Sequence, residues 1–450
     1  MNLPPRPPHL RKVLRPPLRR GGLLNQGTWN LLRERYAHDR LRSRRADAMS
    51  KTIVIVATLD TKSEETRYLK ERIEEAGLET VVVDAGVLGE GSFPADIPSA
   101  QVAQLGGSTI PQLRALRDEG KAMDAMARGA TQAVQDLYRQ GRLDGIIGLG
   151  GSMGTSLGTQ VMRSLPFGLP KVMVSTMASR DVSPWIGHKD IVMLPSVADL
   201  SGLNRMTKRT LSNAAGAIAG MVQADAAVGD GERPIIGIGT LGATEACARH
   251  ARPLLESMGY ETIVFHTVGS GGRALEELIA EGLACGVLEI SIQEVFGNLL
   301  GSPYDAGADR FENAGRMGIP QVVLPGNADF IAWSPPDALP SRYRARHLHM
   351  HNPAITLVRS NADEMRIIAR TLAEKLNKGK GPTAVVVPTE GFSDYSRKGM
   401  FFYEPETDRV FAEALREAID PRIEVIEVPS DINSPACAEA MVEAFRSLQA

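Results

Sequence analysis

A glycine-rich turn with two hydroxyl side chains follows one of the apolar segments of this 450-residue chain. It reads Gly-Leu-Gly-Gly-Ser-Met-Gly-Thr from Gly148 to Thr155. Glycines let a backbone come close to an anion, and the first amides of a following helix point toward it. The residues expected to contact the anion are Gly150, Gly151, Ser152, Gly154 and Thr155. A tight turn that needs glycine only for packing is the alternative, but so many glycines beside two hydroxyls favour a phosphate site.

A second polar turn begins at Thr58, after the first apolar run that follows residue 50. In this turn Asp60 could bind a ribose hydroxyl or Mg²⁺, and Lys62 could bind a phosphate oxygen. Thr61 with Glu64 also fits the capping box of a helix start, which needs no ligand. Both interpretations of Thr61 remain open from this turn alone.

The second half of the chain offers another turn of this kind, from Thr267 to Arg273. Here Gly271 and Gly272 could admit an anion, and Arg273 would supply a fork-shaped donor. Four acidic residues surround the end of a nearby predicted strand and could take part in acid–base chemistry, although a solvated acidic face is the simpler interpretation. They are Glu289, Glu294, Asp305 and Asp309.

Three histidines alternate along one segment, at His347, His349 and His351. Alternation places side chains on one face of an extended strand. Three imidazoles on one face could bind a metal. A packed or solvated edge is the interpretation we favour for them, and we expect no metal. His349 and His351, together with the turn at Arg273, are therefore candidates for a substrate site in the second half.

The elements that must position these residues occur twice. The segment from Lys51 to Asp84 and the segment from Arg233 to His266 each read as an apolar strand, a Thr-Leu turn, a helical run and a second strand. Such recurrence predicts two related α/β units. Ligands of open α/β sheets bind at the carboxyl ends of the strands, which is where the candidate turns fall.

Continuous apolar, β-branched runs predict strands buried on both faces of parallel sheets, with helices between them. The predicted strands are Ile53–Ala57, Val81–Val83, Asp144–Leu149, Lys171–Ser175, Ile191–Leu194, Ile235–Gly239, Thr262–Phe265, Gly286–Ile290, Gln321–Leu324, Ala384–Val387 and Glu424–Glu427. Helical spacing marks 64–76, 112–140 and 202–223, and residues 86–107 are predicted to be a loop that covers the site. We therefore expect an α/β protein with two Rossmann-like parallel-sheet domains, 50–224 and 233–450, that arose by internal duplication.

Charge and composition exclude several classes of protein. Residues 1–48 carry twelve basic and three acidic side chains, whereas the rest of the chain has a net charge of −11. An acidic body argues against a nucleic-acid partner, and no apolar run reaches the length of a membrane helix. The three scattered cysteines, Cys247, Cys285 and Cys437, indicate a reducing, cytoplasmic location. The sequence also lacks a P-loop, a dinucleotide fingerprint and a nucleophile elbow.

Residues 1–49 are rich in proline and arginine and are predicted to be a disordered basic extension. An organellar transit peptide would need an amphipathic helix that the prolines oppose. We favour an upstream translation start, with Met49 as the working initiator just before the first strand.

Several longer motifs together resemble the family of the tomato mosaic virus resistance protein's ATP-binding domain (Tm-one-like). They are Ala57–Lys62, Ile147–Thr155, Leu165–Thr176, Pro195–Asn204, Asn213–Gly216 and Gly271–Ala274. The resemblance extends from about residue 51 to the C-terminus and implies two Rossmann-like halves, dimerisation and ATP binding in the first half, with or without Mg²⁺. The plant member blocks a viral replication helicase, and bacterial members lack an assigned reaction.

Carried onto this chain, the family's nucleotide site falls on two turns already described and on a third strand end. These residues are Asp60, Thr61 and Lys62, the loop 150–155, and Thr176, Ala178 and Ser179. Met153 stands where the family usually has glycine, which leaves the phosphate pose open. The stretches 289–294 and 327–329 also depart from the family pattern, so the ligand of the second half can differ here.

Three functions fit these observations. The first is an ATP-binding, homodimeric enzyme of small-molecule metabolism whose second half forms a substrate or partner pocket. The second is a nucleotide-responsive interaction module without turnover. The third is a metal-dependent lyase or hydrolase that uses the alternating histidines. Sequence alone does not give the substrate, the partner or the reaction.

Overall fold

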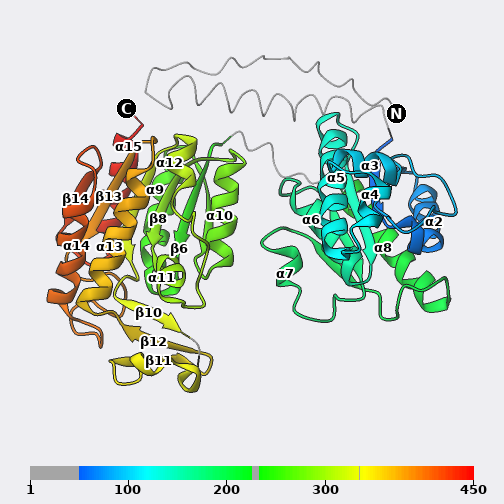
Figure 1. Cartoon of the computed structure of the whole chain (residues 1–450). Coiled ribbons are helices and arrows are strands. Elements are labelled where there is room, and N and C mark those ends of the chain that lie inside the picture. Colours follow the sequence, from blue (N-terminus) through cyan, green and yellow to red (C-terminus); the bar gives the residue numbers. More distant parts are fainter. Residues whose placement is uncertain (1–49, 225–232, 334, 450) are drawn as a thin grey trace, which may run out of the picture.

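The computed structural model of the chain describes residues 50–224, 233–333 and 335–449 (Figure 1). The predictions for residues 1–49 lie outside this range. The described residues form two α/β units, each built on a parallel sheet, and a small third sheet attached to the second unit. The predicted fold class, two Rossmann-like parallel-sheet domains, is confirmed.

The first unit is built on sheet A, a parallel sheet with the strand order β2-β1-β3-β4-β5. Its strands are β1 (Thr52–Ala57), β2 (Glu79–Asp84), β3 (Gly145–Gly150), β4 (Lys171–Ser175) and β5 (Val192–Pro195). Its helices are α2 (Leu59–Glu75), α3 (Ser99–Leu105), α4 (Ile110–Ala115), α5 (Glu119–Arg139), α6 (Ser152–Arg163), α7 (Ser183–Ile186) and α8 (Arg205–Gln223). Helices α2 and α8 bury one face of the sheet and α3, α5 and α6 bury the other, so alternate residues of β1 enter two separate cores.

The second unit is built on sheet B, a parallel sheet with the order β14-β13-β9-β8-β6-β7. Its strands are β6 (Ile235–Thr240), β7 (Glu261–His266), β8 (Ala284–Ser291), β9 (Gln321–Gly326), β13 (Thr383–Pro388) and β14 (Glu424–Val428). Its helices are α9 (Glu245–Ser257), α10 (Ser270–Ala280), α11 (Gln293–Leu300), α12 (Asn313–Met317), α13 (Ala362–Asn377), α14 (Pro405–Ala418) and α15 (Pro435–Ser447). Helices α9 and α15 pack on one face, and α10 to α14 lie on the other.

The topology of the two units supports the repeat found in the sequence. The order β2-β1-β3-β4 of sheet A reappears as β7-β6-β8-β9 in sheet B. In each unit the second strand pairs with one edge of the first strand, and the third strand pairs with the opposite edge of the first. This reversal creates a crevice at the carboxyl ends of the first and third strands, where ligands of such sheets bind.

The structure departs from the sequence expectations in three places. Residues 86–107 are not one loop, because α3 forms within them. The single helix expected over 112–140 is divided into α4 and α5 at Arg117, which has a φ of 49°, and Asp118 caps α5. Sheet C was not expected at all. It is antiparallel, with the order β10-β12-β11, and consists of β10 (Phe330–Trp333), β11 (Leu348–Asn352) and β12 (Ile355–Arg359).

Arg359, at the end of β12, attaches sheet C to the second unit. Its side chain donates to the main-chain oxygen of Asp329 at 2.7 Å and to the carboxylate of Asp408 on α14 at 2.6 Å. Burial raises the pKa of Asp408 to about 7, against the opposing effect of the Arg359 guanidinium. At this junction the carboxyl group of Asp408 is buried, and burial makes its ionised form energetically costly.

The raised pKa of Asp408 should make the folded protein less stable as the pH rises. Because folded Asp408 holds its proton up to about pH 7 and unfolded aspartate loses it near pH 4, stability should fall as pH rises between these values. We expect the fall due to Asp408 to be on the order of 2–4 kcal/mol, and Asp408→Asn should remove it. Urea unfolding of both proteins from pH 4.5 to 8 measures the difference, with the exposed Asp363→Asn as control. Parallel stability curves for the wild type and Asp408→Asn would contradict this account.

Candidate functional site

The two turns singled out in the first half meet at one edge of sheet A. Strands β1, β3 and β4 are parallel and in register, with Val56 opposite Gly148 and Gly150 opposite Ser175. Their carboxyl ends therefore lie side by side. The turn that starts α2, the glycine turn that starts α6, and the strand end after β4 all border the crevice between β1 and β3.

The start of α6 carries unpaired main-chain amides. Gly151 is its N-cap residue, and no side chain caps the helix there. The first amides of any helix lack partners within the helix, and together they attract an anion. Among the side-chain hydrogen bonds of the described residues, none involves the hydroxyl of Ser152, so this group is also free to bind. The predicted phosphate turn thus offers main-chain amide donors, and no side chain caps them.

The glycines of this turn have different roles. A Cβ at Gly150 would lie 2.8 Å from Gly154 Cα, so packing alone requires glycine at 150. At Gly151 a Cβ would meet only Thr176 Oγ1, at 3.8 Å, and the backbone angles there suit any residue. Packing does not explain that glycine. Thr155 is buried and its hydroxyl lies 2.6 Å from Ser175 Oγ, which gives it a structural role.

The turn before α2 contributes one free cation. The Asp60 carboxylate accepts hydrogen bonds from the amides of Val87 and Leu88 at 2.8 and 2.7 Å, and so holds the loop that follows β2. Lys62 sits at a kink in α2 with φ −130° and ψ 27°, and its ammonium group makes no hydrogen bond or ion pair within the described residues. Thr61 does not form the capping box with Glu64, because its hydroxyl lies 3.0 Å from Thr58 Oγ1 instead.

The strand end after β4 completes the edge. The amide of Thr176 donates to Gly150 O at 3.2 Å, which joins this segment to the glycine turn. The amide of Ala178 reaches Ser175 O at 3.5 Å, and Ser179 is exposed. Of the three residues carried over from the family resemblance, Thr176 therefore lies beside the α6 start, and Ala178 and Ser179 follow it along the chain.

One residue of this region was missed in the sequence. Asp84 ends β2, is buried, and accepts hydrogen bonds from the amides of Leu59 and Gly86 at 3.0 and 2.9 Å. Burial is the main cause of the raised pKa of Asp84. The hydrogen bonds from the two amides oppose this increase, and the nearby Asp60 carboxylate adds to it. An acidic residue directly after an apolar strand was the signal that would have found it. Its role is to fix the start of α2 against β2.

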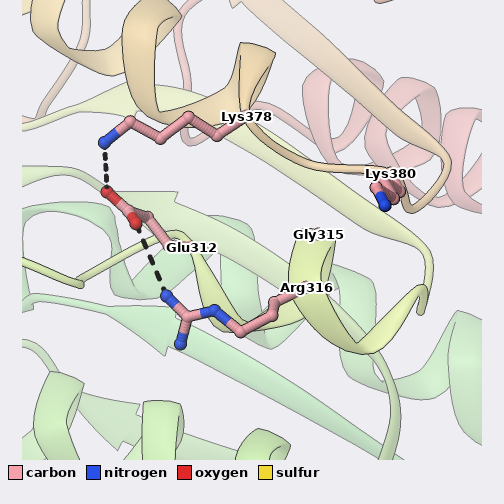
Figure 2. A pocket seen from close by; sticks show the side chains of 5 residues that line it. All are labelled: Glu312, Gly315, Arg316, Lys378 and Lys380. Atoms are coloured by element: carbon pink, nitrogen blue, oxygen red, sulfur yellow. Dashed lines mark hydrogen bonds and ion pairs between the residues drawn. The ribbon is translucent and has the colours of Figure 1, made fainter.

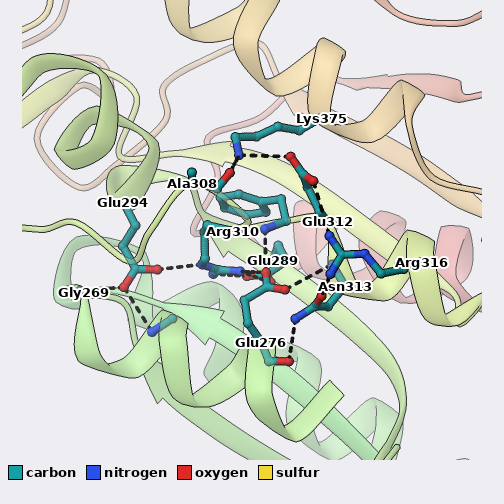
Figure 3. A network of polar contacts seen from close by, with 12 residues as sticks. Gly269, Glu276, Glu289, Glu294, Ala308, Arg310, Glu312, Asn313, Arg316 and Lys375 are labelled. Carbon is teal, nitrogen blue, oxygen red and sulfur yellow. Dashed lines mark hydrogen bonds and ion pairs between the residues drawn. The ribbon is translucent and has the colours of Figure 1, made fainter. Parts of the chain in front are cut away.

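The corresponding turn in the second half is already filled. Helix α10 begins after Gly269, and the carboxylate of Glu294 accepts hydrogen bonds from the amides of Gly269 and Gly272 at 2.6 and 3.1 Å (Figure 3). An external anion at Gly271 and Gly272, as predicted, would therefore have to displace the Glu294 carboxylate. A Cβ at Gly272 would overlap Glu294, so this glycine serves packing. The side chain of Arg273 binds a main-chain oxygen, that of Asp305, at 3.0 Å.

Glu294 belongs to a buried network around Arg310, which the sequence did not reveal. The guanidinium contacts the carboxylates of Glu276 at 3.0 Å, Glu289 at 2.5 Å and Glu294 at 2.7 Å (Figure 3). All four side chains are buried, and burial raises the pKa of Glu276 against the effect of Arg310. Glu289 and Glu294 are thus structural ion-pair partners and not part of a solvated acidic face.

A small charged cavity lies at the other edge of sheet B. Its volume is about 190 Å³, and Figure 2 shows its lining residues, Glu312, Gly315, Arg316, Lys378 and Lys380. Glu312 already pairs with Lys378 at 3.0 Å and with Arg316 at 3.5 Å. It lies before the amino ends of β9 and β13, away from the crevice. Its lining holds one carboxylate and three cationic side chains.

The alternating histidines form an aromatic edge. His349 of β11 stacks on Phe401 with ring centroids 4.1 Å apart, and His351 Nδ1 lies 3.2 Å from the hydroxyl of Tyr395. Partial burial, with the neighbouring histidines, lowers the pKa of His349. Within the described residues no three histidine, cysteine or acidic side chains converge to hold a metal ion. The packed-edge interpretation agrees with these contacts.

Fold and crevice together define a two-domain α/β protein of duplicated, doubly wound topology, with an uncapped helix start at the switch point of its first half. The chain belongs to the uncharacterised protein family UPF0261: residues 51–227 match its N-terminal domain and residues 233–449 its C-terminal domain. Across the described residues, no helix is both long and apolar enough to cross a bilayer.

Curated relatives agree with this assignment. A UPF0261 protein of Clostridium tetani is 42% identical, over 88% of this chain and 98% of its own length. One from Mesorhizobium japonicum is 38% identical, over 87% and 98%. The tomato (Solanum lycopersicum) ToMV resistance protein Tm-1 is 33% identical over 89% of this chain and 56% of its own. The similarity expected from the motifs is thus present, and the family is UPF0261. A UDP-N-acetylglucosamine 2-epimerase structure aligns at a TM-score of only 0.21, with 9% identity over 83% of this chain and 92% of its own, which supports no argument.

The Arg310 network makes a strong prediction about stability. Replacing Arg310 with Met leaves three buried carboxylates without their cation, and we expect a loss of about 3–5 kcal/mol in the free energy of unfolding. The matched control is Arg366→Met, an exposed residue whose ion pair with Asp363 should be worth less than about 1 kcal/mol. Chemical denaturation of both variants measures the two losses, and equal small losses would show that the network is not a stabilising element.

Proposed function

We propose that the protein binds the polyphosphate of a nucleotide, with ATP as the candidate, at the carboxyl edge of sheet A. The observation that carries the proposal is the uncapped start of α6 at the switch point, with the unpaired ammonium group of Lys62 on the same edge. Amides at a helix start and a nearby lysine are both established means of binding phosphate.

The contrast between the two halves supports this choice. The second half satisfies the amides of its glycine turn with the carboxylate of Glu294, whereas the first half places no acidic side chain at the start of α6. In addition, Gly151 is not required by packing. A glycine that neither packing nor backbone angle demands fits a position that a phosphate approaches closely.

The residues present would hold a nucleotide as follows. The amides of the first turn of α6 and the hydroxyl of Ser152 would bind phosphate oxygens, and Lys62 would add a point charge. Mg²⁺ would arrive with the nucleotide. Asp60 already uses Oδ2 for two amides and has its other oxygen left for a metal-bound water or a ribose hydroxyl. The identity of the nucleotide as ATP comes from the family resemblance.

The wider role is part of the same proposal. We expect a cytoplasmic homodimer that acts in small-molecule metabolism, with a substrate or partner pocket in the second domain, and the three buried free cysteines fit a reducing compartment. A nucleotide-responsive interaction module without turnover is the alternative. ATP consumption by the purified protein separates the two. No described contact favours a metal-dependent lyase.

Gly151 provides the sharpest test. Gly151→Val should leave the fold intact and place a side chain where the phosphate approaches, so we expect ATP affinity to fall at least about tenfold, or about 1.4 kcal/mol. Lys62→Ala should cause a loss of similar size, since it removes a charge-assisted contact. Gly216→Ala, in open space on α8, is the matched control.

Isothermal titration with ATP, ADP and NAD measures these affinities, and circular dichroism checks the fold of each variant. Unchanged ATP affinity in both Gly151→Val and Lys62→Ala would remove the proposal. Equal, weak binding of all three ligands by the wild type would do the same.

A further inference from the structure

Val197 is an exposed apolar residue on a strained backbone. It has a φ of 66° and its side chain is 77% exposed. The amide of Ala198 donates to Ser196 O at 2.7 Å, which closes a three-residue γ-turn around Val197. Positive φ is rare for β-branched residues, and a γ-turn of this hand is strained. Glycine would adopt the same turn without strain, and a polar residue would tolerate the solvent better.

The strained turn lies on the same edge of sheet A as the α6 start. The amide of Ser196 donates to Ser175 O at 3.1 Å, so Val197 directly follows the end of β5, beside the end of β4. In the order β3-β4-β5, α6 starts one strand to one side of β4 and Val197 lies one strand to the other. Two strand spacings place Val197 roughly 10 Å from the first amides of α6.

A second exposed apolar side chain lies across the end of β4. Met153 is the second residue of α6 and is 45% exposed. Between Met153 and Val197 runs the segment that begins at Thr176. Backbone strain of the kind found at Val197 tends to cluster at ligand and active sites.

We propose that Val197 and Met153 are the walls of a nucleobase subsite. This inference rests on the proposed function: with phosphates at the start of α6, the ribose would extend over the end of β4 and the planar base would lie against these two side chains. Small-molecule sites usually bind the polar part of a ligand with a few polar groups and surround the rest with apolar side chains. The exposed apolar surface would then be buried only in the complex.

The test uses two probes that share phosphates and differ in the base: ATP and inorganic tripolyphosphate. Val197→Gly should lower ATP affinity by about fivefold or more and leave tripolyphosphate affinity within about twofold. It should also raise the thermal midpoint of the free protein, because strain is released. Met153→Ser should lower ATP affinity in the same selective way. Leu105→Ser, another exposed apolar residue at the end of α3, is the control.

Selective loss of ATP binding in both variants supports the subsite. Equal affinity of the wild type for ATP and tripolyphosphate would overturn it while leaving phosphate binding intact, and so would equal losses for both probes in the variants. If the wild type binds neither probe, the proposed function fails and the base subsite fails with it. Raised thermal stability in Val197→Gly with unchanged ATP affinity would also overturn it.

Discussion

The need of helix starts for a hydrogen-bond acceptor underlies the function proposed for this protein. Every α-helix leaves its first amides unpaired, and at several of its helices this chain meets the need with its own side chains. Asn204 accepts from the amides of Met206 and Thr207 at the start of α8, and Asp118 accepts from Lys121 at the start of α5. Other helices, such as α3 and α14, also lack a side-chain cap. The bare start of α6 is distinguished by its position, directly after β3 at the carboxyl edge of sheet A.

The repeated strand order gives one crevice in each half, and the two crevices differ in what occupies them. In the second half, side chains and a returning segment fill the corresponding space: Thr244 lies 3.3 Å from Asn327 Oδ1, and the amide of Asp394 reaches Ala243 O at 2.9 Å. Glu294 completes the closure at α10. Because the same strand order underlies both units, the difference is one of side chains and loops. Function on this fold is therefore decided by what occupies the strand ends.

The sequence predicted what depends on local pattern. All eleven predicted strands exist, because apolar β-branched runs identify buried parallel strands almost by themselves. It also predicted correctly that Thr58 and Gly151 lie on one sheet edge, since parallel strands align their carboxyl ends. In sheet C the sequence missed two buried apolar strands, β10 and β12, and β11, a half-exposed edge strand with histidines in place of the usual apolar run. The Arg310 network was missed because its three carboxylates lie 16 to 34 residues from Arg310 along the chain, and only folding brings them together.

The same distinction explains why roles were harder to predict than positions. Asp60, Gly271 and Gly272 lie where the sequence placed them, at strand ends. Whether such a residue faces a ligand or another part of the chain depends on long-range contacts. Asp60 meets the loop after β2, and Gly272 meets Glu294. Lys62 and Gly151 remained without such contacts, and this could be learned only from the folded chain.

An ion-pair contact joins the two units. Lys189 of the first unit pairs with Glu281 at 2.7 Å and with Glu277, and its side chain is 3% exposed. This contact lies just before β5 and late in α10, at the amino edges of both sheets. Helix α10 carries Glu277 into this contact and the adjacent Glu276 into the Arg310 network. Helix α10 is therefore the element through which the contact between the units reaches the buried core of the second half.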